Sequence, residues 1–356
     1  MRLVAMAPGE PCACACAVEK RKGKHLIVLA NGLWGQAAHW DVVKTAIDQR
    51  LRSTSSRRYH VHVSKSNQLF DTYAGIDACG DRLKRELDEL VRMEHADADA
   101  ISFIGHSMGG LITRSAVAKA YDREKKKVVL GGRELEPTHF VSLATPHVGF
   151  GDSERCPLDN AWYIPFSRWV VPYVSSRILG ETGRQFFNRD EDKLIMRMAG
   201  DDALQALGAF KTRTAYANVS GDHLVGWGGS SLRQKDEMAE ARKSIDALRD
   251  VKHRGVVRED ALEAALSDKR TSEKEVQTPS SMNLGNAVPE TQDEAMANIS
   301  RLGWRRVDVN WKDARLPGLA HQHIMAQRKR INGVGKETAR HVAEQLYRYE
   351  EHFEVM

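Results

Sequence analysis

The stretch ISFIGHSMGGLITRSAV, residues 101–117, decides the fold. Its first four residues form a short apolar run that predicts a buried strand, and a helix is expected to continue from Leu111. Between them, Gly105, Ser107 and Gly109 form the pattern GxSxG. A serine hydroxyl is a weak nucleophile, so it must stand clear of the sheet on a tight turn where a base can reach it. Small residues on both sides permit such a turn, and the sequence therefore predicts Ser107 as a nucleophile.

A nucleophilic serine needs backbone NH groups to hold the oxyanion that forms when it attacks a carbonyl. The helix after the serine turn offers the NH of Met108. The second donor usually comes from the loop after an earlier strand. The apolar run 26–30 predicts that strand, and the turn NGLWG at 31–35 follows it. Leu33 is the donor that we expect from this turn.

The remaining partners of the serine are an acid and a base, expected in the chain order Ser, Asp, His. Asp222 follows the predicted strand 213–219 directly. The base should lie between the last strand and the final helix, where two imidazoles occur, His321 and His323. We prefer His321, and the sequence leaves His323 open. His106 lies inside the GxSxG pattern and is interpreted as structural, because the base should come from a distant loop.

The rest of the chain alternates β-rich runs with helical stretches, which is typical of a mostly parallel sheet flanked by helices. Apolar residues from Ile76 to Val91 fall at three- and four-residue steps and predict an amphipathic helix. The six predicted strands span residues 26–30, 59–63, 101–104, 140–144, 213–219 and 304–310.

Two insertions interrupt this α/β domain, which is expected to span residues 24–356. The first, about 146–210, is rich in aromatic residues, so it is expected either to form a cap with an apolar pocket for an acyl chain or simply to pack as ordinary core. The second, about 234–293, has no Phe, Trp or Tyr and many charges. Its charges are expected to form a solvated face, with a mobile surface loop over 267–292.

Composition narrows the functional class. The 356 residues include 53 Lys and Arg against 48 Asp and Glu. This mild excess, without a nucleic-acid-binding motif, argues against nucleic acid as a partner. No apolar run approaches the roughly 20 residues of a membrane span. No CxxC, HExxH or glycine-rich phosphate loop occurs, so no cofactor and no metal is expected.

Residues 1–23 are expected to be a flexible leader. Cys12, Cys14 and Cys16 precede a basic run in it and form a candidate acylation site, with a disordered or cleaved leader as the alternative. The five cysteines suggest no disulfide framework, which favours a reducing compartment. The expected location is therefore intracellular, either cytoplasmic or peripheral on a membrane or lipid droplet, and organelle targeting by the leader is left open.

The motifs together resemble a known family, the serine esterases of the DUF676 type, which are lipase-like α/β-hydrolases. The resemblance runs from about Lys24 to the final helix, apart from the long polar insertion. The blocks that carry it are HLIVLANGLWG, SKSNQLFDTYAGIDACGDRL, ISFIGHSMGGLITR, FVSLATPHVG, TGRQFF, YANVSGDHLVGW, WRRVDVNW and the AHQHI stretch.

This resemblance implies the α/β-hydrolase fold and acyl-ester hydrolysis. It implies Ser107 as nucleophile, Asp222 as acid and His321 as base. One position departs from the family pattern, because relatives usually have histidine where this chain has Asn31. Asparagine tolerates turn geometry, so the loop is expected to keep its shape.

Two rival functions remain at this point. A catalytically silent α/β-hydrolase acting as a binding or scaffold protein is suggested by Asn31 and by the charged insertion. A thioesterase or acyltransferase would use the same three residues. The aromatic segment from Trp162 to Tyr173 favours acyl lipids as substrates, because a long acyl chain needs apolar walls. The sequence does not determine the head group, the bond cleaved or the oligomeric state.

Overall fold

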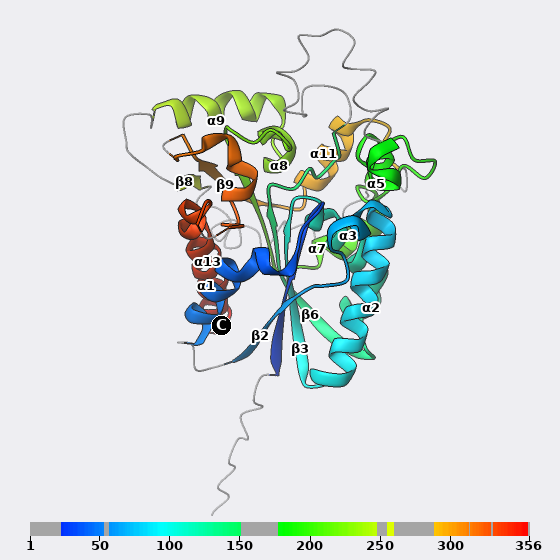
Figure 1. Ribbon diagram of the computed structural model, residues 1–356. Helices are drawn as coiled ribbons and strands as arrows, with labels where there is room; N and C mark the ends of the chain where they lie inside the picture. The colour runs from blue at the N-terminus through cyan, green and yellow to red at the C-terminus, as the bar shows by residue number, and fades with distance from the viewer. Residues whose placement is uncertain are drawn as a thin grey trace, which may run out of the picture.

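A central sheet between two layers of helices forms the described part of the protein, shown as a computed structural model in Figure 1. The structure describes residues 23–52, 57–150, 177–247, 255–259, 288–312, 314–328 and 330–354. Residues 1–22 of the predicted leader, residues 162–173 of the aromatic segment and most of 267–292 lie outside these ranges.

The sheet is mostly parallel, as the sequence predicts. Within the described ranges its main path runs β2-β1-β3-β6-β7-β9-β8, and every neighbouring pair is parallel except β8 and β9. The strands are β1 (Lys24–Ala30), β2 (Arg58–Val63), β3 (Ala98–His106), β4 (Tyr121–Asp122), β5 (Lys127–Leu130), β6 (Arg133–Leu143), β7 (Thr212–Asn218), β8 (Gly255–Glu259) and β9 (Arg305–Asn310).

The helices of the described ranges include short 3-10 turns, labelled η. They are η1 (Ala37–Trp40), α1 (Asp41–Arg52), η2 (Leu69–Tyr73), α2 (Ile76–Glu94), α3 (Met108–Ala120), α5 (Gly180–Phe186), α6 (Leu194–Arg197), α7 (Asp201–Gly208), α8 (Trp227–Ser231), α9 (Lys235–Ala247), α11 (Gln292–Ser300), η4 (Pro317–Leu319), α12 (Ala320–His323), η5 (Gly333–Gly335) and α13 (Lys336–Glu354).

Strand β1 explains why the sheet has two apolar faces. Leu26 and Val28 belong to the core beneath α2 and α3, whereas Ile27 and Leu29 belong to the core beneath α1 and α13. Successive side chains of a strand point to opposite faces, so a continuous apolar run is needed when helices cover both. Figure 1 shows these two helical layers on either side of the sheet. Each fully buried side chain of this size stabilises the fold by about 1.5–3 kcal/mol.

Two parts of the sheet differ from the sequence prediction. Strand β6 begins at Arg133, well before the predicted run at 140–144, because β4, β5 and the first residues of β6 form an antiparallel ribbon. The charged insertion at about 234–293 contains helix α9 and strand β8, and β8 pairs with β9 at the edge of the sheet. Part of that insertion is therefore regular structure and not a loop.

The strand order reverses between β1 and β3, since the chain passes from β1 to β2 on one side and then to β3 on the other. Ligand sites of open parallel sheets lie beyond the carboxyl ends of the strands at such a switch point. The loop after β1 contains Leu33 and the turn after β3 contains Ser107. The topology therefore brings the predicted oxyanion loop and the predicted nucleophile to one edge of the sheet.

Candidate active site

Ser107 occupies a strained turn between β3 and α3. Its backbone has φ 55° and ψ −129°, a left-handed region that a residue with a side chain rarely adopts. The turn is fixed by its neighbours, since the Ser107 NH donates to the carbonyl of Leu143 over 2.9 Å. A Cβ on Gly105 would lie 2.5 Å from the backbone of Gly110, so strand and helix approach too closely for any side chain there.

The loop after β1 packs directly on this turn. A Cβ on Gly32 would lie 2.6 Å from the Ser107 Cβ and 3.0 Å from the Met108 backbone N. Gly32 is thus the contact between the loop that contains Leu33 and the turn that contains Ser107 and Met108. Leu33 itself is partly buried against the core beneath α2 and α3.

Asn31 anchors the same loop from inside. Its side chain is buried, at 5% exposure. Its Oδ1 accepts a hydrogen bond from Trp40 Nε1 over 2.8 Å, and its Nδ2 donates to the carbonyl of Asn67 over 3.3 Å. An amide can accept and donate at once, so this asparagine links the loop to η1 and to the segment after β2.

Asp222 and His321 lie together, although 99 residues separate them in the chain. The turn after β7 carries Asp222 and helix α12 carries His321, and His321 Nδ1 donates to Asp222 Oδ2 over 2.9 Å. Both side chains are almost fully buried, at 8% exposure for His321 and 3% for Asp222. This is the contact that an acid must make to orient an imidazole base.

The Asp222 carboxylate is held ionised. Burial by itself would raise the pKa of Asp222, but attraction to His321 and the hydrogen bonds that the carboxylate accepts lower it below its ordinary value. Besides His321, the donors are the backbone NH groups of Leu224 and Val225 and the side chain of Asn218. Asn218 was not among the predicted site residues; its signal in the sequence was its place at the carboxyl end of β7, where ligand sites of parallel sheets lie.

His323 occupies a different environment. Its Nε2 donates to the carbonyl of Leu316 over 2.7 Å, and its Nδ1 accepts from the side chain of Asn332 over 2.9 Å. Both ring nitrogens are therefore engaged within the loop that precedes α13. Of the two histidines that the sequence left open, His321 is the one that contacts Asp222.

His106 joins the serine turn to His321. Its ring Nε2 donates to the carbonyl oxygen of His321 over 2.8 Å, and the two rings lie with their centroids 4.7 Å apart. No hydrogen bond joins the Ser107 hydroxyl to His321 among the described residues. In a structure without substrate such a bond is often long and forms only when substrate is bound.

Arg114 joins two parts of the first insertion to α3. It projects from α3 into the interior, where its guanidinium donates to the carbonyls of His147 and Met198 over 2.8 and 2.7 Å. Burial lowers the pKa of Arg114 to about 10, which still leaves it charged at neutral pH. His147 lies near the start of the insertion and Met198 directly follows α6, so one cation holds both next to the helix that follows Ser107.

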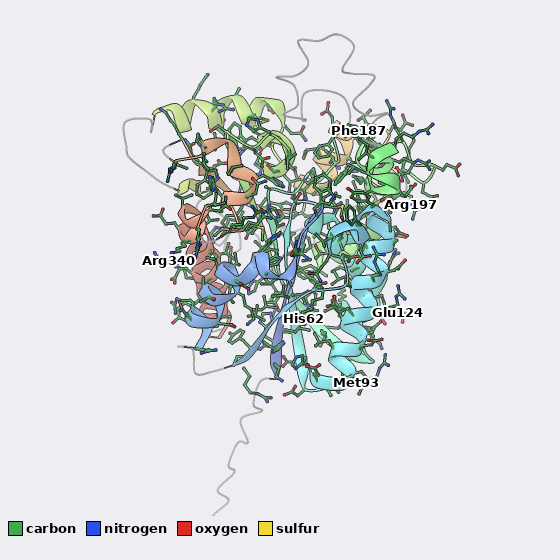
Figure 2. All side chains as sticks on the ribbon, viewed as in Figure 1. His62, Met93, Glu124, Phe187, Arg197 and Arg340 are labelled. Carbon is green, nitrogen blue, oxygen red and sulfur yellow. The ribbon has the colours of Figure 1, made fainter. Side chains whose placement is uncertain are left out.

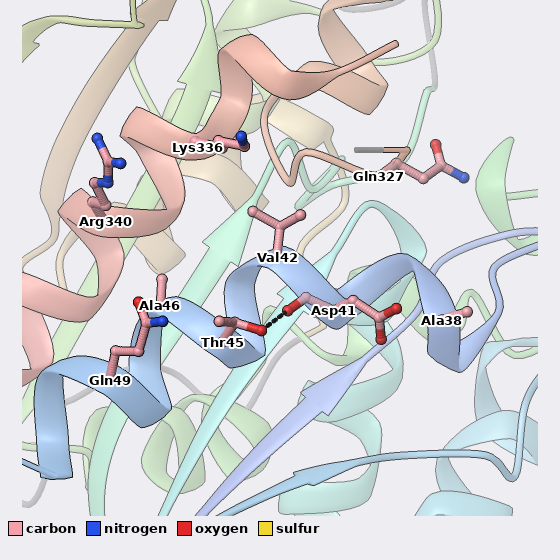
Figure 3. Close-up of a pocket in the computed structure, with 9 residues that line it drawn as sticks. All are labelled: Ala38, Asp41, Val42, Thr45, Ala46, Gln49, Gln327, Lys336 and Arg340. Atoms are coloured by element: carbon pink, nitrogen blue, oxygen red, sulfur yellow. Dashed lines mark hydrogen bonds between the residues drawn. The ribbon is translucent and has the colours of Figure 1, made fainter. Parts of the chain in front are cut away.

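A cavity of about 420 Å³ opens at a different place, between α1 and α13 (Figure 3). Its lining includes Val42 and Ala46 from α1, Lys336 and Arg340 from α13, and Gln327. None of the predicted catalytic or oxyanion residues lines it. Within the described ranges, no group of three or more His, Cys, Asp or Glu side chains is arranged to hold a metal ion.

Comparison with known families decides the classification. The family model described as "Putative serine esterase (DUF676)" matches residues 20–232, which is more than half of the chain. The chain belongs to the DUF676 family. The matched region includes Ser107 and Asp222 but ends before His321, so the contact between Asp222 and His321 comes from the structure and not from the family match.

Curated relatives of this DUF676 member carry lipase names. "Putative lipase ROG1" from Saccharomyces cerevisiae is 29% identical over 216 residues, covering 58% of this chain and 28% of that protein. "Putative lipase C4A8.10" from Schizosaccharomyces pombe is 25% identical over 224 residues, covering 59% of this chain and 26% of that protein. The matched region thus spans less than a third of the length of either relative.

Solved structures similar to this chain include phospholipase PlaB from Legionella pneumophila in complex with thio-NAD. It is 11% identical with a TM-score of 0.37, and the match covers 55% of this chain and 38% of that one. A monoacylglycerol lipase from Paleococcus ferrophilus is 10% identical with a TM-score of 0.32, covering 58% of this chain and 77% of that one.

The chain is a DUF676 α/β-hydrolase, with the mainly parallel sheet and flanking helices of that fold. Family and fold point to a hydrolase of the esterase and lipase type. None of the helices in the described ranges is both long enough and apolar enough to cross a bilayer.

Proposed function

We infer that the protein hydrolyses carboxylic esters with Ser107 as nucleophile, His321 as general base and Asp222 as the carboxylate that orients the base. The observation that carries this proposal is the 2.9 Å hydrogen bond between His321 Nδ1 and Asp222 Oδ2, at the same sheet edge as the strained Ser107 turn. The three residues follow β3, β7 and β9 in turn, which is the chain order typical of this fold.

The reaction follows from these positions. His321 takes the Ser107 proton on Nε2 as the oxygen attacks the ester carbonyl, and the ionised Asp222 stabilises the resulting imidazolium through Nδ1–H. The NH groups of Leu33 and Met108 receive the oxyanion, and His321 then gives its proton to the leaving alcohol. Water repeats the sequence on the acyl-enzyme and releases a carboxylic acid.

A fluorophosphonate probe, which reacts covalently with activated serines, tests the nucleophile. The wild-type chain is expected to become labelled, whereas Ser107→Ala is not. His321→Ala is expected to label at a rate lower by a factor of about 10³ or more, because the serine loses its base. Equal labelling of wild type and Ser107→Ala would show that the reactive serine has been misassigned.

Acyl lipids are the substrate class we propose, approached at a membrane or droplet surface. Exposed apolar side chains lie in and beside the oxyanion loop, with Trp34 of the loop at 50% exposure and Leu69 and Phe70 of η2 at 44% and 75%. Trp34 Nε1 donates to Tyr73 Oη over 2.6 Å, and Leu69 donates its NH to the carbonyl of Gly35, so the two segments are tied together. Exposed apolar clusters of this kind favour contact with lipid.

The length of the acyl chain distinguishes lipid substrates from short-chain esters. Long-chain esters are expected to be hydrolysed with a higher kcat/KM than acetyl or butyryl esters, because a long acyl chain gains binding energy from apolar surface. The comparison uses p-nitrophenyl esters of increasing length at equal detergent concentration. A preference for acetyl or butyryl groups would contradict the assignment to lipids and leave the esterase assignment intact.

A further inference from the structure

His106 is a buried histidine that the proposed reaction does not use, yet it contacts the proposed base directly. Its Nε2 lies 2.8 Å from the carbonyl oxygen of His321. A carbonyl oxygen can only accept a hydrogen bond, so the proton of the neutral ring must be on Nε2. The ring also packs against the ring of His321, with centroids 4.7 Å apart and an interplanar angle of 48°.

His106 is fixed in place by the sheet, whereas His321 is not part of it. His106 is the last residue of β3 and pairs with Leu143 of the neighbouring strand β6. His321 belongs to α12, which has only four residues and follows the short turn η4. A hydrogen bond from the rigid strand to the short helix therefore fixes the backbone of His321 relative to Ser107, the next residue after His106.

We propose that His106 is a positioning residue for His321, holding the backbone and ring of the base beside the Ser107 hydroxyl. This inference rests on the proposed function, because it assigns His321 the role of base. The role needs His106 to remain neutral. Burial, followed by repulsion from His321, lowers the pKa of His106 to about 3, so the catalytic proton stays on His321.

Three substitutions separate the hydrogen bond from the bulk of the ring. His106→Phe keeps a ring without a donor, and His106→Asn keeps an amide that is too short to reach the carbonyl. His106→Gln places an NH close to where the imidazole Nε2 lies. We expect kcat to fall about tenfold in the Phe and Asn variants with KM nearly unchanged, which corresponds to about 1.4 kcal/mol, and we expect His106→Gln to recover most of this loss.

The pH profile of kcat/KM provides a readout that a purely structural role would not move. When His321 is poorly held, its contact with Asp222 loosens, and the carboxylate stabilises the imidazolium less. The acid limb of the profile is therefore expected to shift to lower pH in His106→Phe and to return in His106→Gln. Rates are expressed per serine labelled by the fluorophosphonate probe, so that misfolded molecules do not count.

His139→Phe is the matched control. His139 is also buried, at 1% exposure, and its Nδ1 forms a 2.8 Å hydrogen bond with Thr212 Oγ1 in the neighbouring part of the sheet. Its loss is expected to lower stability without moving the acid limb.

Two results would count against the proposal, and they differ. If the wild-type chain neither cleaves esters nor reacts with the probe, the proposed function and this inference both fall. If the wild type is active and His106→Phe and His106→Asn match it in kcat per labelled serine and in the acid limb, His106 does not position the base and the esterase proposal stands.

Discussion

Glycine at position 32 decides how closely the oxyanion loop approaches the nucleophile. A methyl group there would meet the Ser107 Cβ at 2.6 Å, the His106 carbonyl oxygen at 2.8 Å and the Met108 N at 3.0 Å. All three atoms belong to residues 106–108, where β3 passes into α3, and the backbone atoms among them cannot move as the end of a flexible side chain can. The strain at Ser107 is tolerated because the surrounding contacts leave this turn no room to relax.

We therefore expect Gly32→Ala to lower kcat about a hundredfold, the usual effect of losing one oxyanion donor, while the chain still folds. The added methyl group must push the loop with Leu33 away from Met108. Gly333→Ala serves as the control, because a Cβ there meets nothing within 4 Å. Steady-state kinetics on a soluble ester, with circular dichroism to check folding, measures the effect. Similar kcat values for the two alanine variants would contradict this account of the loop.

At the residue scale, the predictions of Ser107 and Asp222 as site residues rest on local patterns in the sequence. The glycines around Ser107 and the position of Asp222 after a strand are such patterns. No local pattern distinguishes His321 from His323, because both histidines occur in one short segment. Only the three-dimensional contact with Asp222 distinguishes them. The hydrogen bond from His106 to His321 joins residues 215 positions apart in the chain, so no local sequence pattern predicts it.

At the scale of elements, a buried ion pair joins the segment after α8 to strand β9. It links the part of the chain that follows Asp222 to the part that precedes His321. Arg233, just after α8, donates to Asp308 Oδ1 of β9 over 2.7 Å, with 2% and 0% of the side chains exposed. Trp227 Nε1 donates to the same oxygen over 2.8 Å. The chain reaches α8 directly from the Asp222 turn, and it continues from β9 towards His321.

Arg233→Met is expected to lower the free energy of unfolding by about 3–5 kcal/mol, because it leaves the Asp308 charge buried without its cation. Adding Asp308→Asn should recover more than half of that loss, since asparagine carries no charge and still accepts from Trp227. Urea titration of both variants and of wild type gives the free energies. A double variant no more stable than Arg233→Met would show that the charge is not the cause.

The elements that the sequence missed are those that depend on pairing at a distance or on an overlooked turn. Strand β8, GVVRE, is short and contains two charged residues, so its own sequence does not predict a strand. Its partner β9 lies about fifty residues further along the chain. The ribbon before residue 140 had a usable signal. Gly131 and Gly132 form a two-residue turn with φ 55° and 79°, the geometry that a tight hairpin requires.

For the whole molecule, several buried or partly buried histidines make stability depend on pH. Burial is the main cause in each case, and it lowers the pKa of His106 to about 3 and the pKa values of His60 and His341 to about 4. His60 lies only 4.1 Å from the ring of His95 and on the same strand as His62, so neighbouring histidines add to its shift. Figure 2 labels His62 in this region, and its Nε2 contacts Glu86 of α2 over 3.1 Å.

Carboxylates affect the free energy of unfolding in a lower pH range than the histidines do. Burial would raise the pKa of Glu86, but hydrogen bonds from His62, Ser64 and the backbone after β2 lower it to about 2. A carboxylate with a depressed pKa contributes stability that is lost as the pH falls through its folded value. Glu86 therefore begins to matter only below about pH 4.5, whereas the histidines act between about pH 6.5 and pH 3–4.

The free energy of unfolding is accordingly expected to fall as the pH is lowered from 7 to 5. In that range the unfolded chain binds protons at its histidines, and the folded chain, with depressed pKa values, does not. His106 alone should account for about 2 kcal/mol of this loss, and the half-exposed His60 for less. Urea titrations at pH 7, 6 and 5 measure it, with His106→Gln as the comparison, because glutamine does not titrate and should flatten the dependence. A wild-type protein as stable at pH 5 as at pH 7 would mean that these imidazoles accept protons in the folded state.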